Sequence, residues 1–373
     1  MLFLFACSES ALQLTESGVL APHSSADSTA SADSDPQVVD SSVDSATDSA
    51  ADSAPPDPGE TGETVEEPQT CLEYLSGQTG VSPDYAQFAP VLNAACLGTN
   101  HQDIAGVEHV VFVGDSVTVG TPPTNVEEFY RNLLAADFAT RFGLEAPSYD
   151  WQWYDLLNGT ALVQDSGAFS VCAKYGGRTD DLVQDNNQVI DCIPEERAAE
   201  TTLVVTTVGG NDLFALVEDY HAGVPVEELW LQVENEVQLL REAVSYLKTD
   251  KVRFPGEMYV VFANVFEFTD GMGNVDACPG AASLGYVYDL SAPELTEMIR
   301  YYEEEYMRIA VDTQSDMVFV GENFCGHGYN AEDATGPCYR SDDRALWFDF
   351  TCFHPNDLGH AAIAEMVLST VDE

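Results

Sequence analysis

A serine that follows a buried strand and a tight turn is the first residue of this chain that could do chemistry. Residues 110–113 are apolar and mostly β-branched, which predicts a buried strand, and Gly114-Asp115-Ser116 follows directly. Ligands of open α/β sheets bind where the strands end, and N–H groups at the start of the next helix attract anions. Ser116 is therefore a candidate nucleophile, although a serine here could also serve simply as a helix N-cap.

Three other segments supply the partners that a serine nucleophile needs. A second apolar strand ends at residue 208 in a glycine turn that leads to the amide side chain of Asn211. Another glycine turn contains Gly177, and His354 lies near the C-terminus, directly before a proline. Acyl transfer requires a nucleophile, donors for an oxyanion and a base, and these segments offer all three.

The four segments resemble the sequence blocks of the SGNH (GDSL) hydrolase superfamily of esterases and lipases. They occur in that family's order, and they match at Gly114-Asp115-Ser116, Gly177, Asn211 and His354. The resemblance implies that Ser116 is the nucleophile and His354 the base. It implies an oxyanion hole made by the N–H groups of Ser116 and Gly177 and by the Asn211 side chain. It also implies that the reaction needs no metal and no organic cofactor.

The chain departs from the family pattern at one position that matters for the base. The family places an aspartate three residues before the histidine, and Thr351 stands there instead. Such an aspartate orients the imidazole and stabilises its charged form. Asp349, five residues before His354, is the candidate replacement for the triad acid. Two alternatives stay open: Asp349 could be a solvated turn residue or a helix cap, and a backbone carbonyl could orient the ring of a catalytic dyad.

The elements that position these residues alternate between strand and helix. Apolar runs predict strands at 108–114, 168–174, 202–208, 257–264 and 316–320. Helical patterns cover 126–142, 180–187, 226–248, 292–313 and 356–371. This spacing is typical of βαβ units, so we expect a three-layer, flavodoxin-like α/β fold with a central parallel sheet of about five strands. Residues 71–105 are expected to form a largely helical cap, which places the hydrolase domain at 71–373.

Composition excludes some classes of partner. The chain of 373 residues has 64 acidic and only 13 basic side chains. Residues 8–70 contain 14 of the acidic and none of the basic residues, and they are rich in Ser, Ala and Asp, which predicts a disordered linker. The rest of the chain is acidic too. Such a surface argues against nucleic-acid binding and against electrostatic docking on anionic membranes.

The first seven residues suggest export. The five residues 2–6 are all apolar and directly precede Cys7, as at the end of a bacterial lipoprotein signal, although the segment has no basic start and is short. We expect residues 1–7 to be the remnant of a processing signal and Cys7 to be the lipidated first residue of the mature protein. The linker would then be a tether, and lipid at Cys7 the only contact with a membrane. The alternative is a truncated ordinary signal peptide with an incidental cysteine.

The remaining cysteines form an even set, which in an exported chain predicts up to four disulfides. The candidates are Cys71, Cys96, Cys172, Cys192, Cys278, Cys325, Cys338 and Cys352. Proximity in sequence favours the pairs Cys71–Cys96, Cys172–Cys192, Cys278–Cys325 and Cys338–Cys352, although about 100 pairings are possible. The last pair would brace the loop that carries His354.

These observations predict an exported serine hydrolase, monomeric and cell-envelope-bound or secreted, that cleaves lipid or small acyl esters. A carbohydrate O-acetyl esterase acting on an acylated glycan and an acyltransferase would use the same site. A surface binding module that kept the fold but not the activity is the alternative from another class. Aromatic residues in 277–290 and 149–154 are candidates for the substrate rim; for the second segment, packing in the core is the favoured interpretation.

Overall fold

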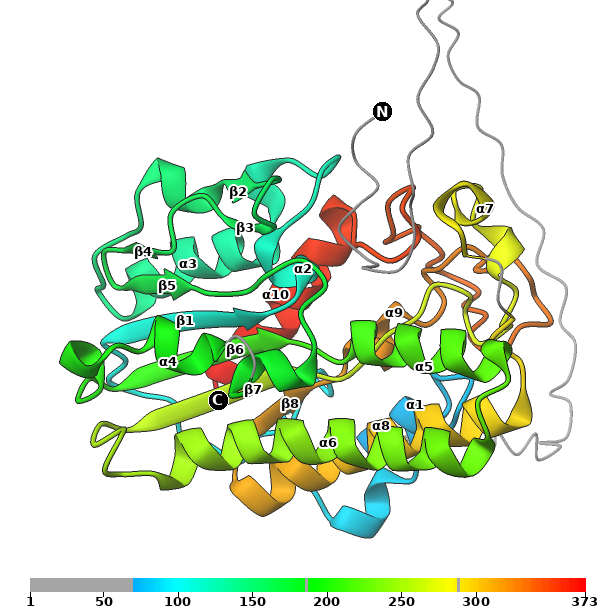
Figure 1. Ribbon diagram of the computed structural model, residues 1–373, viewed down its shortest axis with the longest axis horizontal. Helices are drawn as coiled ribbons and strands as arrows, with labels where there is room; N and C mark the ends of the chain where they lie inside the picture. Colours follow the sequence, from blue (N-terminus) through cyan, green and yellow to red (C-terminus); the bar gives the residue numbers. More distant parts are fainter. Residues whose placement is uncertain (1–69, 185–186, 287–288) are drawn as a thin grey trace, which may run out of the picture. The chain divides into compact units, whose positions relative to one another are not determined.

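A six-stranded sheet forms the centre of the described part of the chain, which the computed structural model gives as residues 70–184, 187–286 and 289–373 (Figure 1). Five neighbouring strands are parallel, and the edge strand β4 runs antiparallel to β5. In spatial order the strands are β4 (Asp165–Ser166), β5 (Phe169–Val171), β1 (His109–Gly114), β6 (Thr202–Thr207), β7 (Met258–Ala263) and β8 (Asp316–Val318). The predicted α/β class and all five predicted parallel strands are confirmed.

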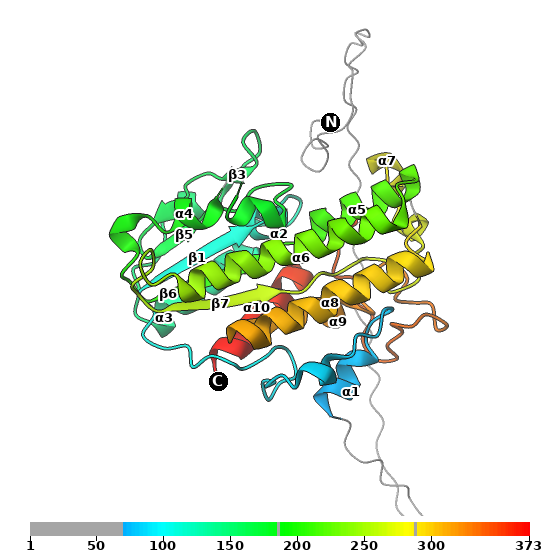
Figure 2. The ribbon, with the colours of Figure 1, turned by 60° about the horizontal axis from the view of Figure 1, so that its bottom comes forward.

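Helices cover both faces of this sheet and complete three layers (Figures 1 and 2). One face carries α5 (Gly210–Ala222), α6 (Val226–Thr249) and α8 (Pro293–Thr313), and the other carries α3 (Tyr130–Arg141) and α10 (Asp357–Val371). Side chains of β1 alternate between two apolar cores, as the period of a strand requires. Val111 and Val113 pack with α6 and α8, whereas Val110 and Phe112 pack with α3 and α10.

Some elements differ from the sequence prediction. α5 is a complete helix between the left-handed residues Gly209 and Gly223, where only a glycine turn was expected. Its apolar positions Leu213, Leu216 and Val217 have helical spacing, so the signal was present but short. The edge strand β4 and a small hairpin of β2 (Tyr154–Asp155) and β3 (Thr160–Ala161) were also not predicted.

Two predicted helices are interrupted. The segment 126–142 begins as a 3-10 turn at Val126–Glu128, and α3 starts only after Phe129, whose backbone is extended. The Phe129 ring is fully buried and lies against Gly120, so its burial prevails over local helix propensity. The predicted helix 180–187 is instead a 3-10 turn at Thr179–Leu182, followed by α4 (Gln188–Cys192).

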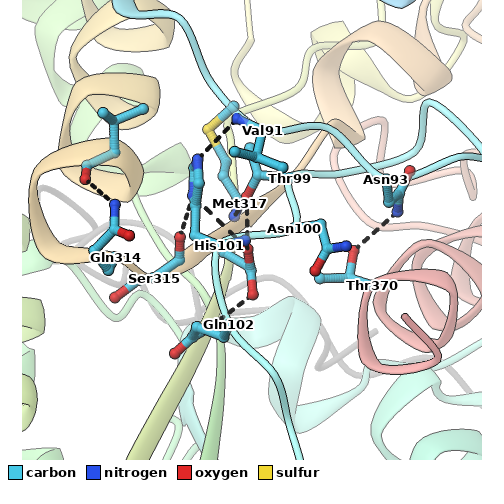
Figure 3. A network of polar contacts seen from close by, with 12 residues as sticks. Val91, Asn93, Thr99, Asn100, His101, Gln102, Gln314, Ser315, Met317 and Thr370 are labelled. Atoms are coloured by element: carbon cyan, nitrogen blue, oxygen red, sulfur yellow. Dashed lines mark hydrogen bonds and ion pairs between the residues drawn. The ribbon is translucent and has the colours of Figure 1, made fainter.

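The segment before β1 is mostly not helical, which corrects the expectation for 71–105. It contains α1 (Cys71–Ser76) and a 3-10 turn at Tyr85–Phe88, and residues 98–101 run beside the edge strand β8. The Thr99 N–H donates to Met317 O at 2.9 Å, and the His101 ring contacts both Val91 N at 3.1 Å and Ser315 O at 2.8 Å (Figure 3). These contacts cover the sheet edge, so the segment belongs to the core architecture.

Four disulfides join all eight predicted cysteines, but two of the predicted pairs are wrong. Cys71–Cys96 and Cys172–Cys192 are confirmed, whereas the others are Cys278–Cys352 and Cys325–Cys338. Proximity in sequence failed because the segment around Cys278 folds back onto the loop before His354. A Cβ atom on Gly280 would lie 2.1 Å from Phe350 O, and the Tyr286 and Phe353 rings are 4.1 Å apart.

The predictions for residues 1–7, the linker 8–70 and lipidation at Cys7 lie outside the described residues. Within the described part, no helix is long and apolar enough to cross a membrane.

The pairing of Cys278 with Cys352 makes a measurable prediction. This disulfide joins residues 74 apart, so chain entropy predicts that a Cys278→Ala/Cys352→Ala variant loses about 4.5 kcal/mol of unfolding free energy. The matched Cys71→Ala/Cys96→Ala control removes a 25-residue separation and should lose about 3.5 kcal/mol. Denaturant unfolding measures both losses. A non-reducing peptide map that links Cys338 to Cys352 would contradict the assignment.

Candidate active site

Close contact between β1 and β6 forces the turn that carries Ser116. Gly114 has a φ of +123°, and a Cβ atom there would lie 2.0 Å from Thr207 O, so the position requires glycine. Asp115 is the N-cap of α2 (Ser116–Val119), where its carboxylate accepts hydrogen bonds from Val117 N at 3.0 Å and Thr207 Oγ1 at 2.9 Å. Ser116 is therefore the first residue of a helix, where N–H groups lack intrahelical partners.

The Ser116 side chain meets His354 across 238 residues of sequence. The distance between Ser116 Oγ and His354 Nε2 is 2.9 Å, and both side chains are buried. Burial lowers the pKa of His354 to about 4, so the imidazole is neutral at pH 7 and can accept a proton. The structure thus brings together the two residues that the sequence analysis selected as nucleophile and base.

A tight turn holds His354 in this position. The Asp349 N–H donates to His354 O at 2.9 Å, and the Cys352 N–H donates to Asp349 O at 3.1 Å. Cys352 has a φ of +74° and is linked to Cys278. After the turn, Asn356 caps α10 by accepting hydrogen bonds from Leu358 N at 3.0 Å and Gly359 N at 3.1 Å. His354 is therefore held by contacts on both sides of it in sequence.

Thr351 lies between the imidazole and Asp349. Its Oγ1 is 2.8 Å from His354 Nδ1, and its hydroxyl is also hydrogen-bonded to Asp349 Oδ1. The carboxylate accepts the Thr351 N–H at 2.8 Å as well. Asp349 thus lies near His354, as the sequence suggested, but it is linked to the ring through the Thr351 hydroxyl. From the sequence, Thr351 is interpreted only as a missing charge, although a threonine hydroxyl can both donate and accept hydrogen bonds.

The two glycine segments meet beside Ser116. A Cβ atom on Gly177 would lie 2.5 Å from Gly114 O, so this glycine packs directly against the nucleophile turn. The Asn211 amide donates to Gly177 O at 2.9 Å, which uses one of its two N–H donors. The Gly177 N–H donates to Lys174 O at 3.0 Å. The assigned oxyanion roles of Ser116, Gly177 and Asn211 remain predictions.

Two buried acids, Asp115 and Asp212, form hydrogen bonds that hold the turn at Ser116 and the segment after Gly177. Burial raises the pKa of Asp115 to about 7, although hydrogen bonds from Thr207 and the backbone oppose the shift. Burial likewise raises the pKa of Asp212 to about 6. Asp212 accepts hydrogen bonds from Thr179 N at 3.2 Å and Thr179 Oγ1 at 3.0 Å, which joins the start of α5 to the segment after Gly177. Neither Thr179 nor Thr207 is predicted from the sequence to belong to the site.

A cavity opens beside Ser116, Asn211 and His354 and holds about 1160 Å³ of atom-free space, including solvent at its mouth. Its lining is mainly apolar, with aromatic side chains at Phe214, Phe266, Phe268, Tyr286, Phe348 and Phe353. Tyr286 and Leu290 come from the segment 277–290, which the sequence suggested for the rim. Trp151, by contrast, is fully buried in the core against Phe112 and Phe169.

The fold is similar to that of several solved esterases. An extracellular lipase from Streptomyces rimosus is 17% identical with a TM-score of 0.44, and the match covers 71% of this chain and 100% of that one. Phospholipase A1 from Streptomyces albidoflavus is 16% identical with a TM-score of 0.42, covering 71% and 99%. A carbohydrate acetylesterase from Sinorhizobium meliloti is 12% identical with a TM-score of 0.39, covering 71% and 98%. Among curated protein sequences no match is found.

The sequence also matches a family model over most of its folded part. The GDSL-like lipase/acylhydrolase model aligns with residues 110–367, which begin in β1 and end in α10. This range contains the serine, glycine, asparagine and histidine segments described above. With more than half of its length matched, the chain belongs to the GDSL-like lipase/acylhydrolase family.

Proposed function

We propose that the protein hydrolyses carboxylic esters through an acyl-enzyme on Ser116. The observation that carries this proposal is the 2.9 Å contact between Ser116 Oγ and the neutral imidazole of His354. A serine hydroxyl is a weak nucleophile, and an adjacent base is what activates it. Membership of the GDSL-like family supports ester hydrolysis as the reaction class.

In the proposed reaction, His354 Nε2 takes the Ser116 proton as Oγ attacks the ester carbonyl. The carbonyl oxygen becomes an oxyanion, which the Ser116 N–H and the Asn211 amide stabilise. The Gly177 N–H joins them if its turn reorients when substrate binds. The imidazolium then protonates the leaving alcohol as the ester C–O bond breaks and the acyl-enzyme forms. Water attacks the acyl-enzyme carbonyl with His354 again as base, and the imidazolium returns this proton to Ser116 Oγ as the acid leaves. Hydrolysis thus returns Ser116 to its starting state.

The cavity favours an ester with an apolar acyl group. Six aromatic side chains line it, and each buried methylene group contributes about 0.8 kcal/mol to binding. Esters with acyl chains longer than acetyl, such as lipid esters, therefore fit the site better than the acetyl esters of a glycan, which need little apolar space. Acyl transfer to an alcohol would use the same residues. The intact contact between Ser116 and His354 argues against a binding module without activity.

Four disulfides support an extracellular or cell-envelope location, because such bonds persist in oxidising compartments. Attachment through lipid at Cys7 remains part of this proposal, as does a monomeric state.

A fluorophosphonate probe tests the proposed nucleophile. We expect the full-length, oxidised protein to be labelled at Ser116, as mapped by mass spectrometry, and labelling to disappear in Ser116→Ala and His354→Ala. Asn211→Ala should still be labelled but turn over p-nitrophenyl butyrate about 10²–10³-fold more slowly, since one oxyanion donor is lost. A folded wild-type protein that is neither labelled nor active would refute ester hydrolysis and favour the binding module.

The acyl preference can be measured separately with p-nitrophenyl acetate, butyrate and palmitate. We expect kcat/KM to rise from acetate to the longer chains, because the cavity removes more apolar surface from water. Phe214→Ala is expected to reduce this preference by up to about tenfold while acetate hydrolysis changes less. A wild-type preference for acetate would contradict the lipid assignment and support a carbohydrate acetylesterase.

A further inference from the structure

The hydroxyl of Thr351 occupies the place next to His354 Nδ1 where a serine hydrolase of this kind would hold a carboxylate. Thr351 Oγ1 lies 2.8 Å from Nδ1, while Asp349 Oδ1 accepts both the hydroxyl and the N–H of Thr351. Asp349 is 5% exposed, and its Oδ2 has no hydrogen-bond partner within the described part of the chain. Thr351 therefore links a buried acid to the base.

The direction of each hydrogen bond follows from the number of protons available. An ionised carboxylate can only accept, so the single hydroxyl proton of Thr351 points to Asp349 Oδ1. Thr351 Oγ1 must then accept a hydrogen bond from Nδ1–H of His354. The proton of the neutral imidazole is thereby fixed on Nδ1, and the lone pair of Nε2 faces Ser116 Oγ. This is the tautomer that can deprotonate the serine.

We propose that Thr351 is a positioning residue through which Asp349 selects the tautomer and orientation of His354, an inference that rests on the proposed esterase function. Throughout the reaction the Thr351 proton stays on its own oxygen. When His354 receives the Ser116 proton, Nδ1–H remains bonded to Thr351 Oγ1, and the negative charge of Asp349 polarises that oxygen. Asp349 is thus a second positioning residue and does not touch the reacting atoms.

Loss of the charge on Asp349 reverses this chain of hydrogen bonds. A protonated Asp349 can donate to Thr351 Oγ1, which frees the threonine proton to point at Nδ1. The imidazole proton then lies on Nε2, and the ring cannot accept the proton of Ser116. The arrangement is therefore competent only while Asp349 is ionised.

The groups around Asp349 set the pH at which its carboxylate becomes protonated. Burial raises the pKa of Asp349 to about 6, although the hydrogen bonds from Thr351 oppose the shift. Tyr329 donates to Asp349 O at 2.6 Å, and burial together with the Asp349 charge raises the pKa of that phenol. Burial lowers the pKa of His354 to about 4 and of His360 to about 3, so both rings stay neutral. We therefore expect the acidic limb of kcat/KM near pH 6.

Variants at Thr351 separate the hydroxyl from the shape of the side chain. Thr351→Val keeps the branched shape but cannot bond Nδ1, so kcat/KM for p-nitrophenyl butyrate should fall by about 10²–10⁴, as expected when a base loses its tautomer control. Thr351→Ser keeps the hydroxyl and should retain activity within about tenfold of wild type. Thr140→Val, on the exposed face of α3, is the matched control and should not change kcat/KM.

A double-mutant cycle tests whether Asp349 acts through Thr351. Asp349→Asn should lower kcat/KM in the wild-type background but cause little further loss in the Thr351→Val background, because the link is already broken. Additive losses would show that Asp349 acts by another route. Combining Asp349→Asn with Thr351→Asp places a carboxylate directly beside Nδ1 and should recover activity to within about tenfold of wild type.

The pH profile of kcat/KM would not change if Asp349 only stabilised the fold, so it tests the positioning role directly. The wild-type limb near pH 6 should disappear in Asp349→Asn, leaving at lower activity only the titration of His354 near pH 4. Nitrogen-15 NMR, assigned with His354→Gln, should show Nδ1–H in the wild type above pH 6 and a mixture of tautomers in Thr351→Val. An unchanged limb in Asp349→Asn would overturn the role of Asp349.

Failure of the Thr351 proposal can be distinguished from failure of the proposed esterase function. If fluorophosphonate labels Ser116 but Thr351→Val keeps wild-type kcat/KM, the positioning role is wrong and the esterase proposal stands. If the folded wild type is neither labelled nor active, both proposals fail. Should Thr351→Val not fold, as judged by thermal unfolding, the pH profile of Asp349→Asn and the activity of Thr351→Ser decide the question.

Discussion

The contact between Ser116 and His354 depends on long-range folding of the chain and not on the residues next to either side chain. The two are 238 residues apart, so closing the chain between them costs entropy that the rest of the fold must offset. Parallel strands of the sheet all end at the same edge, which places Ser116 and the start of α5 together. His354 is held at this edge by α10, by the N-cap of that helix at Asn356 and by the disulfide between Cys278 and Cys352.

The acidic composition of the sequence is also reflected in the hydrogen-bond partners of the buried aspartates. With 64 acidic and 13 basic residues, few cations are available to pair with buried carboxyl groups. Four buried aspartates instead accept hydrogen bonds from threonine hydroxyls: Asp115 from Thr207, Asp212 from Thr179, Asp316 from Thr99 and Asp349 from Thr351. In each case the threonine hydroxyl bonds one carboxylate oxygen without cancelling the charge, so desolvation dominates and raises the pKa of each acid. The pair of Thr351 and Asp349 is one instance of this pattern.

How far the sequence predicts the molecule depends on the range of each interaction. Strands such as 202–208 and the turn at Ser116 are encoded by neighbouring residues, and their places could be predicted from apolar runs and glycines. The partner of Cys278 could not, because it depends on a segment that folds back from elsewhere. Thr351 was recognised as a departure but its use was missed, since the orientation of a hydroxyl depends on the turn that holds it. Helix α5 was missed because a short amphipathic pattern beside glycines resembles a loop.

The placement of Asp349 also bears on the low pKa of His354. A carboxylate in direct contact with an imidazole favours its charged form and raises its pKa. Here the charge lies one hydroxyl further away, and Coulomb attraction falls with distance. Desolvation therefore controls His354 and lowers its pKa to about 4. In the proposed mechanism, Thr351 lets Asp349 direct the imidazole proton, while the imidazolium is stabilised less than by a directly bonded aspartate. Orientation and charge stabilisation, which one residue usually provides together, are partly separated in this mechanism.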